Sequence, residues 1–128
     1  MDLKSYFEVN KGTGVLSTAN GAGNVNSAIY ARPHIMDDGS VAFIMRDRLS
    51  HHNLASNPHA AYLFREGNSG YKGVRLHLSK IREEHGTPLV QELCRRCRIK
   101  EEPDAVRYLV VFQIDKEMPL IGPEDPVE

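Results

Sequence analysis

The sequence predicts a mainly β fold in which six antiparallel strands, accompanied by short helices, close into a barrel. Three observations predict it. Apolar and polar residues alternate in most segments between turns, which is the period of a strand with one buried face. Gly, Asn and Asp collect in short turns between these segments, as they do in hairpins. Antiparallel strands in this number usually form a barrel, because closure removes exposed sheet edges.

The first half of the chain is expected to hold one short helix and three strands. Leu3, Tyr6 and Phe7 have helical spacing, and Gly12 closes that segment. Pro33 ends the pairing of the second strand on one side, because proline has no backbone N–H to donate. The third strand, VAFIMR, is nearly all apolar, which predicts that both of its faces are covered. The expected segments are a helix at 3–10 and strands at 14–19, 25–32 and 41–46.

The second half is expected to add two helices and three more strands. In segment 71–81 three apolar residues alternate with polar ones, so one face of that strand is expected to be buried. Thr87 and Pro88 are typical of a helix start. The expected segments are a short helix that stops at Asn57-Pro58, a longer helix at 87–98, and strands at 60–66, 71–81 and 107–115.

Length and charge limit the class of protein. With 128 residues the chain is expected to form one domain at 1–122, followed by a flexible tail at 123–128. The net charge of -1 gives no reason to expect nucleic acid or an anionic membrane surface as a partner. No apolar run approaches the roughly 20 residues that span a bilayer. The start of the chain does not resemble a signal peptide, so we expect a soluble cytoplasmic protein.

The two cysteines, Cys94 and Cys97, form a single CxxC. This pair is half of a four-ligand zinc site, and no second cluster follows it. The arginines around it would lower a thiol pKa, so a redox dithiol is an open alternative. We favour two reduced thiols on one amphipathic helix, and no metal site is expected.

Segment 46–58, RDRLSHHNLASNP, gathers many hydrogen-bond donors at the start of a predicted helix. The free N–H groups and the dipole of a helix start attract anions, and arginines strengthen such a site. The alternative is purely structural: Ser50 caps the helix, the arginines are solvated, and the histidines lie on the surface of the first turn. His51 and His52 are adjacent on a helix and point about 100° apart, so they do not easily share a metal ion.

Residues 14–64 carry a resemblance to a known family. They read GVLSTANGAGNVNSAIYARPHIMDDGSVAFIMRDRLSHHNLASNPHAAYLF and resemble the FMN-binding split-barrel family that includes the pyridoxamine 5'-phosphate oxidases. The ordered motifs are a G-x-L-x-T strand, a Gly-containing turn, a D-G-x-x-x-F strand and an N-L-x-x-N-P segment. The matching residues are Gly14, Leu16, Thr18, Gly39, Phe43, Asn53, Leu54, Asn57 and Pro58.

The resemblance implies a six-stranded antiparallel split β-barrel that forms a homodimer, with FMN in two clefts at the subunit interface. The second strand would lie beside the flavin, the third would bond its ring edge through the backbone, and segment 46–51 would bind its phosphate. Lys72 would reach the flavin of the partner subunit. The implied cofactor-binding residues are Asn26, Ser27, Ala28, Arg32, Phe43, Ile44, Met45, Arg46, Arg48, Ser50, His51 and Lys72.

The sequence also departs from the family pattern. Leu49 stands where some members carry a basic phosphate ligand, so Arg32, Arg46 or Arg48 must supply the charge. The substrate-binding motif of the true pyridoxamine phosphate oxidases is not recognisable after residue 107. The resemblance therefore implies an FMN-dependent oxidoreductase whose small-molecule substrate or electron donor is unknown, and no catalytic residue is identified.

Three alternatives remain open at this stage. The protein could be a flavin-binding electron carrier or sensor without turnover, or a split barrel that binds haem instead of flavin. His34 is interpreted as a turn residue, with a role as proton donor near the flavin as its alternative. Tyr30 is expected to belong to the core or to an interface.

Overall fold

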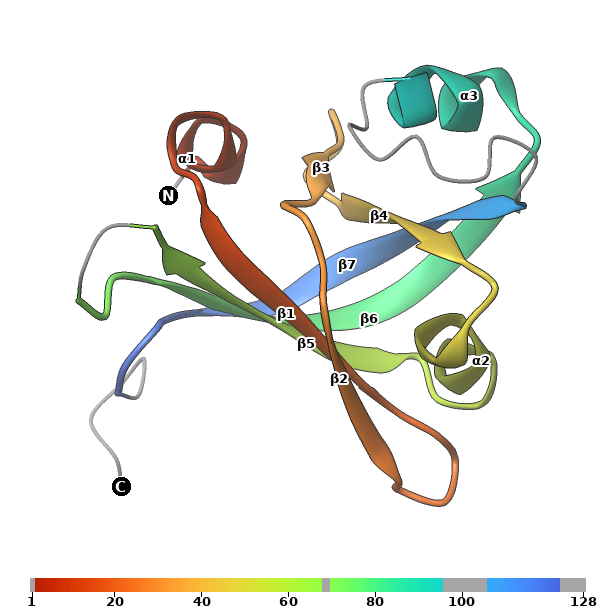
Figure 1. The fold of residues 1–128 in the computed structure, drawn as a ribbon, viewed down its shortest axis with the longest axis horizontal. Coiled ribbons are helices and arrows are strands. Elements are labelled where there is room, and N and C mark those ends of the chain that lie inside the picture. Colours follow the sequence, from red (N-terminus) through yellow and green to blue (C-terminus); the bar gives the residue numbers. More distant parts are fainter. Residues whose placement is uncertain (1, 68–69, 96–105, 123–128) are drawn as a thin grey trace.

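The strands of the described residues lie in one antiparallel sheet (Figure 1). The computed structural model describes residues 2–67, 70–95 and 106–122. The order of the strands in the sheet is β2-β1-β5-β6-β7-β4-β3. These strands are β1 (Gly12–Ala19), β2 (Val25–Ile29), β3 (His34–Ile35), β4 (Val41–Arg46), β5 (His59–Glu66), β6 (Gly73–His85) and β7 (Arg107–Pro119).

The strand count of six is wrong, because the described residues contain seven strands. The additional strand is β3, which consists of two residues after Pro33 and pairs with the start of β4. Two residues are too few to show a hydrophobic period, so a sequence pattern cannot reveal such a strand. The hydrogen-bonded order is also open, with β2 and β3 at its two ends, so the ladder does not close into a complete barrel.

The concave side of the sheet encloses the main core. Tyr62, Phe64 and Phe112 are fully buried there, as is Leu16 of β1. The predicted alternation of β6 is confirmed, because Val74, Leu76 and Leu78 are the buried residues of that strand's first half. The other members of this core cluster are Leu3, Phe7, Val41, Phe43, Met45, Leu54 and Val110.

β4 is covered on both faces, as its apolar sequence predicts. Phe43 and Met45 face the main core, whereas Ala42 belongs to a second cluster on the opposite face. Helix α3 (Pro88–Arg95) covers that second face with Val90 and Leu93. Its start is capped as predicted, because the Val90 N–H donates to Thr87 Oγ1 at 3.3 Å. The end predicted for this helix, with Cys97, lies outside the described residues, and so do the side chain of Cys94 and the tail at 123–128.

Helix α1 (Leu3–Val9) packs its buried residues Leu3 and Phe7 on the core. Asp2 caps its start, and Asn10 is the residue that ends it. Gly12 does not close the helix as predicted, because it already pairs with Glu66 as the first residue of β1.

Helix α2 (Leu49–Ser56) is fixed to β1 and to the turn that follows it. Asn53 Nδ2 donates to Thr18 Oγ1 at 3.1 Å, and both residues are buried. Ser56 Oγ accepts from the Gly21 N–H at 3.1 Å, and Leu54 enters the main core. These contacts hold the second half of α2 against β1, the turn after it and the core. No helix of the described residues is long and apolar enough to cross a membrane.

Candidate functional site

The two ends of the sheet approach each other at the start of α2. Tyr30, which follows β2, packs against Phe43 of β4 with ring centroids 5.9 Å apart. Helix α2 contacts β1, β2 and β4, so it spans the gap in the ladder (Figure 1). Tyr30 is half-buried against the core, which confirms the core alternative for that residue. We call this region, between β2, the second half of β4 and the start of α2, the split site.

β4 offers backbone hydrogen-bonding groups to the split site. Its inner edge pairs with β7 from Val41 to Arg46. Its outer edge pairs with β3 only at Val41 and Ala42, so residues 43–46 face no further strand of the described chain. The side chains of Phe43 and Met45 are buried in the core, and that of Ile44 packs toward α3. Their side chains therefore do not reach the split site. The N–H and C=O of one residue in an antiparallel strand point to the same edge, and the Ser40 carbonyl oxygen accepts from the Met36 N–H on the outer edge, so Ile44 is the one of the three whose backbone groups point outward.

The start of α2 has no side-chain cap. The N-cap residue is Arg48, whose side chain makes no capping hydrogen bond. Ser50 is therefore not the N-cap, and that part of the structural alternative is wrong. Its side chain is buried and makes a hydrogen bond with the Tyr30 hydroxyl instead. Burial raises the pKa of Tyr30, while the Ser50 hydrogen bond and the charge of Arg48 oppose that rise.

The three predicted phosphate arginines occupy different environments. Arg48 is exposed beside the helix start, and its charge acts on the Tyr30 hydroxyl. Arg46 is half-buried at the end of β4 and already has an interaction partner. Arg32 Nη1 donates to the carbonyl oxygens of Phe7 at 2.6 Å and Asn10 at 2.9 Å. Arg32 thus binds the carboxyl end of α1, a role that its sequence context does not reveal.

His51 lies between two carboxylates. Its Nδ1 is 3.0 Å from Asp47 Oδ1, and its Nε2 is 3.0 Å from Glu83 Oε2. The ring stacks on Tyr108 at a centroid distance of 4.0 Å, and only 14% of the side chain is exposed. His51 is therefore not a first-turn surface residue. His52, in contrast, is exposed and lies 3.5 Å from Asp47 Oδ1.

Glu83 has a second partner besides His51. Lys80 Nζ donates to Glu83 Oε1 at 2.6 Å. Burial raises the pKa of Glu83, but the hydrogen bonds from Lys80 and His51 outweigh it, so the pKa lies below its ordinary value of 4.5. Glu83 is absent from the predicted site residues, because it lies 32 positions from His51 and only the fold brings the two together.

The three predicted residues of β2 do not share one face. Asn26 and Ala28 are half-buried opposite Thr18 and Leu16, whereas Ser27 is exposed and its hydroxyl lies 2.8 Å from that of Ser17. Successive side chains of a strand point to opposite faces. A ligand on one face of β2 can therefore contact the side chains of Asn26 and Ala28, or that of Ser27, but not all three. β2 is an end strand of the sheet, and its outer backbone edge faces the split site.

Lys72 lies far from α2 within its own subunit. It precedes β6 at the turn after β5, and α2 leads into the opposite end of β5. Lys72 is exposed there, and its carbonyl oxygen accepts from the Glu66 N–H at 2.9 Å. One chain alone therefore does not bring Lys72 to the split site.

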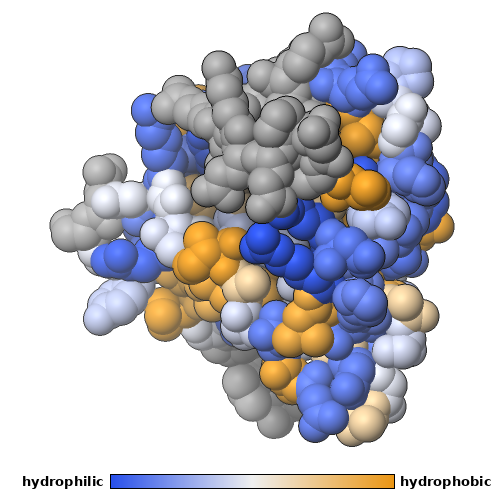
Figure 2. Space-filling view, turned by 45° about the vertical axis from the view of Figure 1, so that its right-hand side comes forward, coloured by the Kyte–Doolittle hydropathy of each residue, from blue (hydrophilic) through white to orange (hydrophobic). Residues whose placement is uncertain are grey.

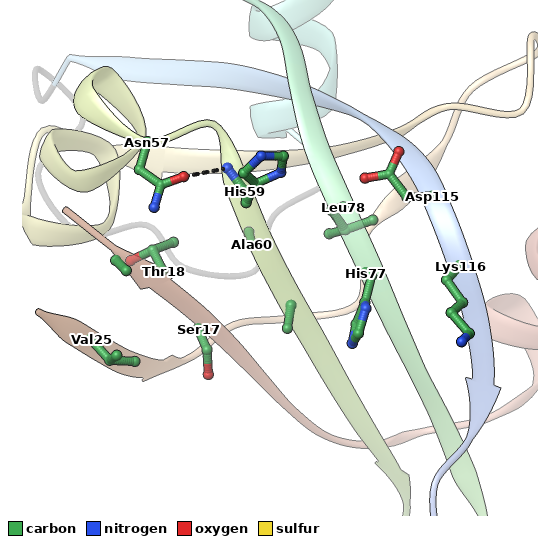
Figure 3. A pocket seen from close by; sticks show the side chains of 12 residues that line it. Ser17, Thr18, Val25, Asn57, His59, Ala60, His77, Leu78, Asp115 and Lys116 are labelled. Atoms are coloured by element: carbon green, nitrogen blue, oxygen red, sulfur yellow. Dashed lines mark hydrogen bonds between the residues drawn. The ribbon is translucent and has the colours of Figure 1, made fainter. Parts of the chain in front are cut away.

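A second hollow, of about 600 Å³, lies on the convex side of the sheet (Figure 3). His59, His77, Asp115 and Lys116 surround it. Ser79 Oγ donates to Asp115 Oδ2 and lies 3.2 Å from His59 Nδ1. Hydrogen bonds from Ser79 and Gln113 lower the pKa of Asp115, and the positive potential of the nearby histidines adds to this. Within the described residues no group of three or more His, Cys, Asp or Glu residues could hold a metal ion.

The surface around α2 and α3 is mixed in character. Figure 2 turns this side of the molecule forward, and hydrophilic side chains cover much of it between smaller apolar patches. Exposed polar residues beside α2 include Asp47, Arg48 and His52. The polar side chains beside the start of α2 carry charges of both signs, and the exposed apolar residue Leu49 lies among them.

Solved structures share this fold. An FMN-binding protein from Syntrophomonas wolfei subsp. wolfei is 16% identical, with a TM-score of 0.77 over 92% of this chain and 83% of its own. A candidate pyridoxamine 5'-phosphate oxidase from Lactobacillus delbrueckii is 12% identical, with a TM-score of 0.67 over 92% of each chain. HutZ, the haem storage protein from Vibrio cholerae, is 14% identical, with a TM-score of 0.63 over 92% of each chain.

The sequence itself has no such counterpart: no protein-family model matches it, and no curated protein does. At identities this low the structural likeness shows the fold alone. The similar structures are proteins that bind different cofactors, FMN in one case and haem in another. What they share with this chain is the split-barrel fold of the pyridoxamine 5'-phosphate oxidase type, so the type of fold that residues 14–64 imply is confirmed, with seven strands in place of six among the described residues.

Proposed function

We propose that the protein binds FMN in the split site and acts as a flavin-dependent oxidoreductase on a small molecule. One observation carries the proposal: the uncapped start of α2 follows β4 directly, and no strand of the described residues covers the outer edge of β4 at residues 43–45. The first offers N–H groups and a positive dipole to a phosphate. The second offers backbone donors and acceptors to the edge of a planar ring.

The residues of the split site fit the chemistry of FMN. Arg48 adds a formal positive charge beside the helix start, and charge-assisted hydrogen bonds from arginine suit a phosphate dianion. The helix dipole by itself contributes only about 0.3–1 kcal/mol for an exposed anion, so such a cation is needed. A ligand of about 31 heavy atoms at roughly 0.3 kcal/mol per atom would bind with a dissociation constant on the order of micromolar or below.

The flavin would supply the redox chemistry, since it accepts and releases a hydride equivalent. The protein's own residues would orient and shield it. Tyr30, held by Ser50, closes the core side of the site, and the buried Phe43 and Met45 fix the backbone of β4. None of these residues is assigned the role of a catalytic acid or base.

The proposal includes a homodimer. Three apolar residues, Val25, Ile29 and Leu63, are exposed on the convex side of the sheet at 74%, 72% and 40%. The register places Ile29 and Leu63 on either side of Val15, so they form one row across β2, β1 and β5. A second subunit on this surface would bury the row, and it could bring a partner's Lys72 toward the split site.

A flavin titration tests the proposal. Adding the purified protein to FMN should quench flavin fluorescence with a dissociation constant on the order of micromolar or below, and riboflavin, which lacks the phosphate, should bind more weakly. Protein that does not change flavin absorbance or fluorescence at high micromolar concentration would overturn it. Bleaching of bound flavin by NADH or NADPH, followed by reoxidation with an acceptor, separates an oxidoreductase from an electron carrier or sensor.

Haem binding is the second candidate function. His59 and His77 line the hollow on the convex side, and the similar fold of HutZ belongs to a haem storage protein. His59 Nδ1 lies beside Ser79, which leaves Nε2 for a ligand. Haem titration should then give a Soret band that weakens in His59→Ala or His77→Ala, together with no retention of FMN.

A further inference from the structure

The ring of His51 joins the start of α2 to β6. Asp47 lies in the turn before α2, and Glu83 lies on β6, so the imidazole is in contact with a carboxylate on each side. Tyr108 of β7 forms the floor under the ring. The charged or titratable groups around His51 are Asp47, His52, Lys80, Glu83, His85 and Tyr108.

The two contacts require a particular protonation state. An ionised carboxylate accepts hydrogen bonds and donates none, and a neutral imidazole carries a single N–H. His51 can therefore donate to Asp47 and Glu83 together only when both of its ring nitrogens are protonated. A neutral ring keeps one of the two hydrogen bonds and places a nitrogen lone pair against the other carboxylate.

The charge of His51 also matters for the neighbouring anion site. Asp47 lies directly between Arg46 and Arg48, beside the uncapped start of α2. A carboxylate at this position repels a phosphate, and a protonated His51 offsets that repulsion. The loss of one proton from His51 would therefore loosen the anchor of the helix start and make the split site more negative.

We propose that His51 is a positioning residue that makes the hold on the flavin phosphate depend on pH. Its doubly protonated ring bonds to Asp47 and Glu83 together and offsets the charge of Asp47, whereas its neutral ring keeps only one of the two bonds and carries no charge. This inference rests on the proposed FMN site and goes beyond it, since His51 then acts through the helix start and does not touch the cofactor.

The test compares His51→Gln with wild type from about pH 5 to 9, a range that spans the titration of ordinary histidines. His52→Gln is the comparison variant, because His52 is 69% exposed and lies 3.5 Å from Asp47 Oδ1 but has no contact with Glu83 like that of His51. Fluorescence titrations give the dissociation constants of FMN and of riboflavin. The second ionisation of the FMN phosphate, near pH 6, affects all three proteins alike, so the ratio between variant and wild type isolates the protein's contribution.

We expect wild type to bind FMN roughly fivefold more tightly than His51→Gln at the acidic end, with the difference disappearing at the alkaline end. Riboflavin should show no such pH-dependent ratio, and His52→Gln should show a smaller one than His51→Gln, because His52 is exposed and contacts only Asp47 of the two carboxylates. An FMN ratio that is constant with pH, or one that riboflavin reproduces, would overturn the inference.

A second measurement keeps the inference separate from the proposed function. Thermal unfolding without flavin should show a larger stability difference between wild type and His51→Gln at acidic pH than at alkaline pH, since both ion pairs need the charged ring. If FMN fails to bind at any pH, the proposed function fails, and this difference still tests the anchor. Equal unfolding temperatures at every pH would show that His51 does not fasten α2.

Discussion

Two arginines that the sequence assigns to the same phosphate have different structural roles. Arg48 is exposed beside the uncapped start of α2, whereas Arg32 donates to two carbonyl oxygens at the end of α1. Lysine or arginine near a helix C-terminus satisfies orphan carbonyls and complements the dipole. The local sequence ARPH around Arg32 contains no sign of this, because α1 lies more than 20 residues earlier.

Replacing Arg48 tests the charge of the split site. Arg48→Ala should weaken FMN binding roughly tenfold, which corresponds to about 1.4 kcal/mol, because a charge-assisted hydrogen bond to phosphate is lost. Arg48→Lys should retain part of the affinity. Fluorescence titration with FMN and riboflavin measures both, and an equal loss for the two ligands would show that Arg48 does not bind the phosphate.

Replacing Arg32 distinguishes two roles of this residue: binding the carboxyl end of α1, and binding the phosphate of FMN. Arg32→Ala should lower the free energy of unfolding by about 1–3 kcal/mol, because two carbonyl oxygens lose their donor. We expect its effect on FMN affinity at low temperature, where the variant is folded, to be smaller than that of Arg48→Ala. Urea denaturation followed by circular dichroism gives the stability. Unchanged stability combined with a large loss of FMN affinity would restore the phosphate role implied by the resemblance.

At the scale of single elements, α2 is held by a buried hydrogen bond rather than by a strong apolar face. Leu54 is its one apolar contribution to the main core, and Asn53 bonds to Thr18 of β1. Asn53→Ala should destabilise the protein by about 1–3 kcal/mol, because Thr18 Oγ1 loses its donor in a buried place. The double variant Thr18→Val/Asn53→Ala should lose less free energy of unfolding than the two single variants lose together. Chemical denaturation of wild type, both single variants and the double variant checks this.

Apolar pattern decides which elements could be predicted from the sequence. β4 and α3 could be predicted, because their buried residues appear in the sequence as an apolar pattern: the run VAFIMR in β4, and Val90 and Leu93 in α3. β3 was not, since its two residues depend on pairing with β4. The site shows the same division: the donors at the start of α2 are local in sequence, whereas the partner of His51 is Glu83, brought near by the path of β6.

The interactions of Glu83 on β6 make the folded protein less stable at acidic pH. Its pKa is lower in the folded protein than its ordinary value of 4.5, mainly through Lys80 and His51 acting against burial. The stabilisation is therefore fully present above about pH 4.5 and is lost as pH falls through the lower, folded pKa. The stability difference between wild type and Glu83→Gln should shrink over that range, whereas the exposed control Glu8→Gln should show little change. A difference that stays constant down to pH 2 would contradict this.

At the scale of the whole molecule, the helices cover part of the sheet and leave apolar residues exposed on its convex side. α1 and α2 add Leu3, Phe7 and Leu54 to the main core, and α3 covers the opposite face of β4 and β7. The row of Ile29, Val15 and Leu63 lies on the convex side of the other strands. Its neighbouring row holds the small residues Ser27, Ser17 and Ala61, and Ser17 and Ala61 also line the hollow on this side of the sheet.

A charge placed in this row tests the homodimer and the completeness of the split site together. Leu63→Glu puts a carboxylate in the row of the proposed interface, where a second copy would have to desolvate it. Wild type should have a mass in solution near twice 14.4 kDa, and Leu63→Glu should be a monomer. Val9→Glu, at a residue that is 77% exposed on α1, is the matched control and should remain dimeric.

The same variants decide whether each flavin site needs both subunits. Lys72 lies at the far end of β5 from α2, so it can approach a split site only across the interface. If it does, the Leu63→Glu monomer should bind FMN at least tenfold more weakly, and Lys72→Ala should weaken FMN binding without changing the mass. Sedimentation equilibrium and fluorescence titration on the same samples measure the two quantities. A monomer that binds FMN as tightly as wild type would show that one chain completes the site, and a dimeric Leu63→Glu would place the interface on another surface.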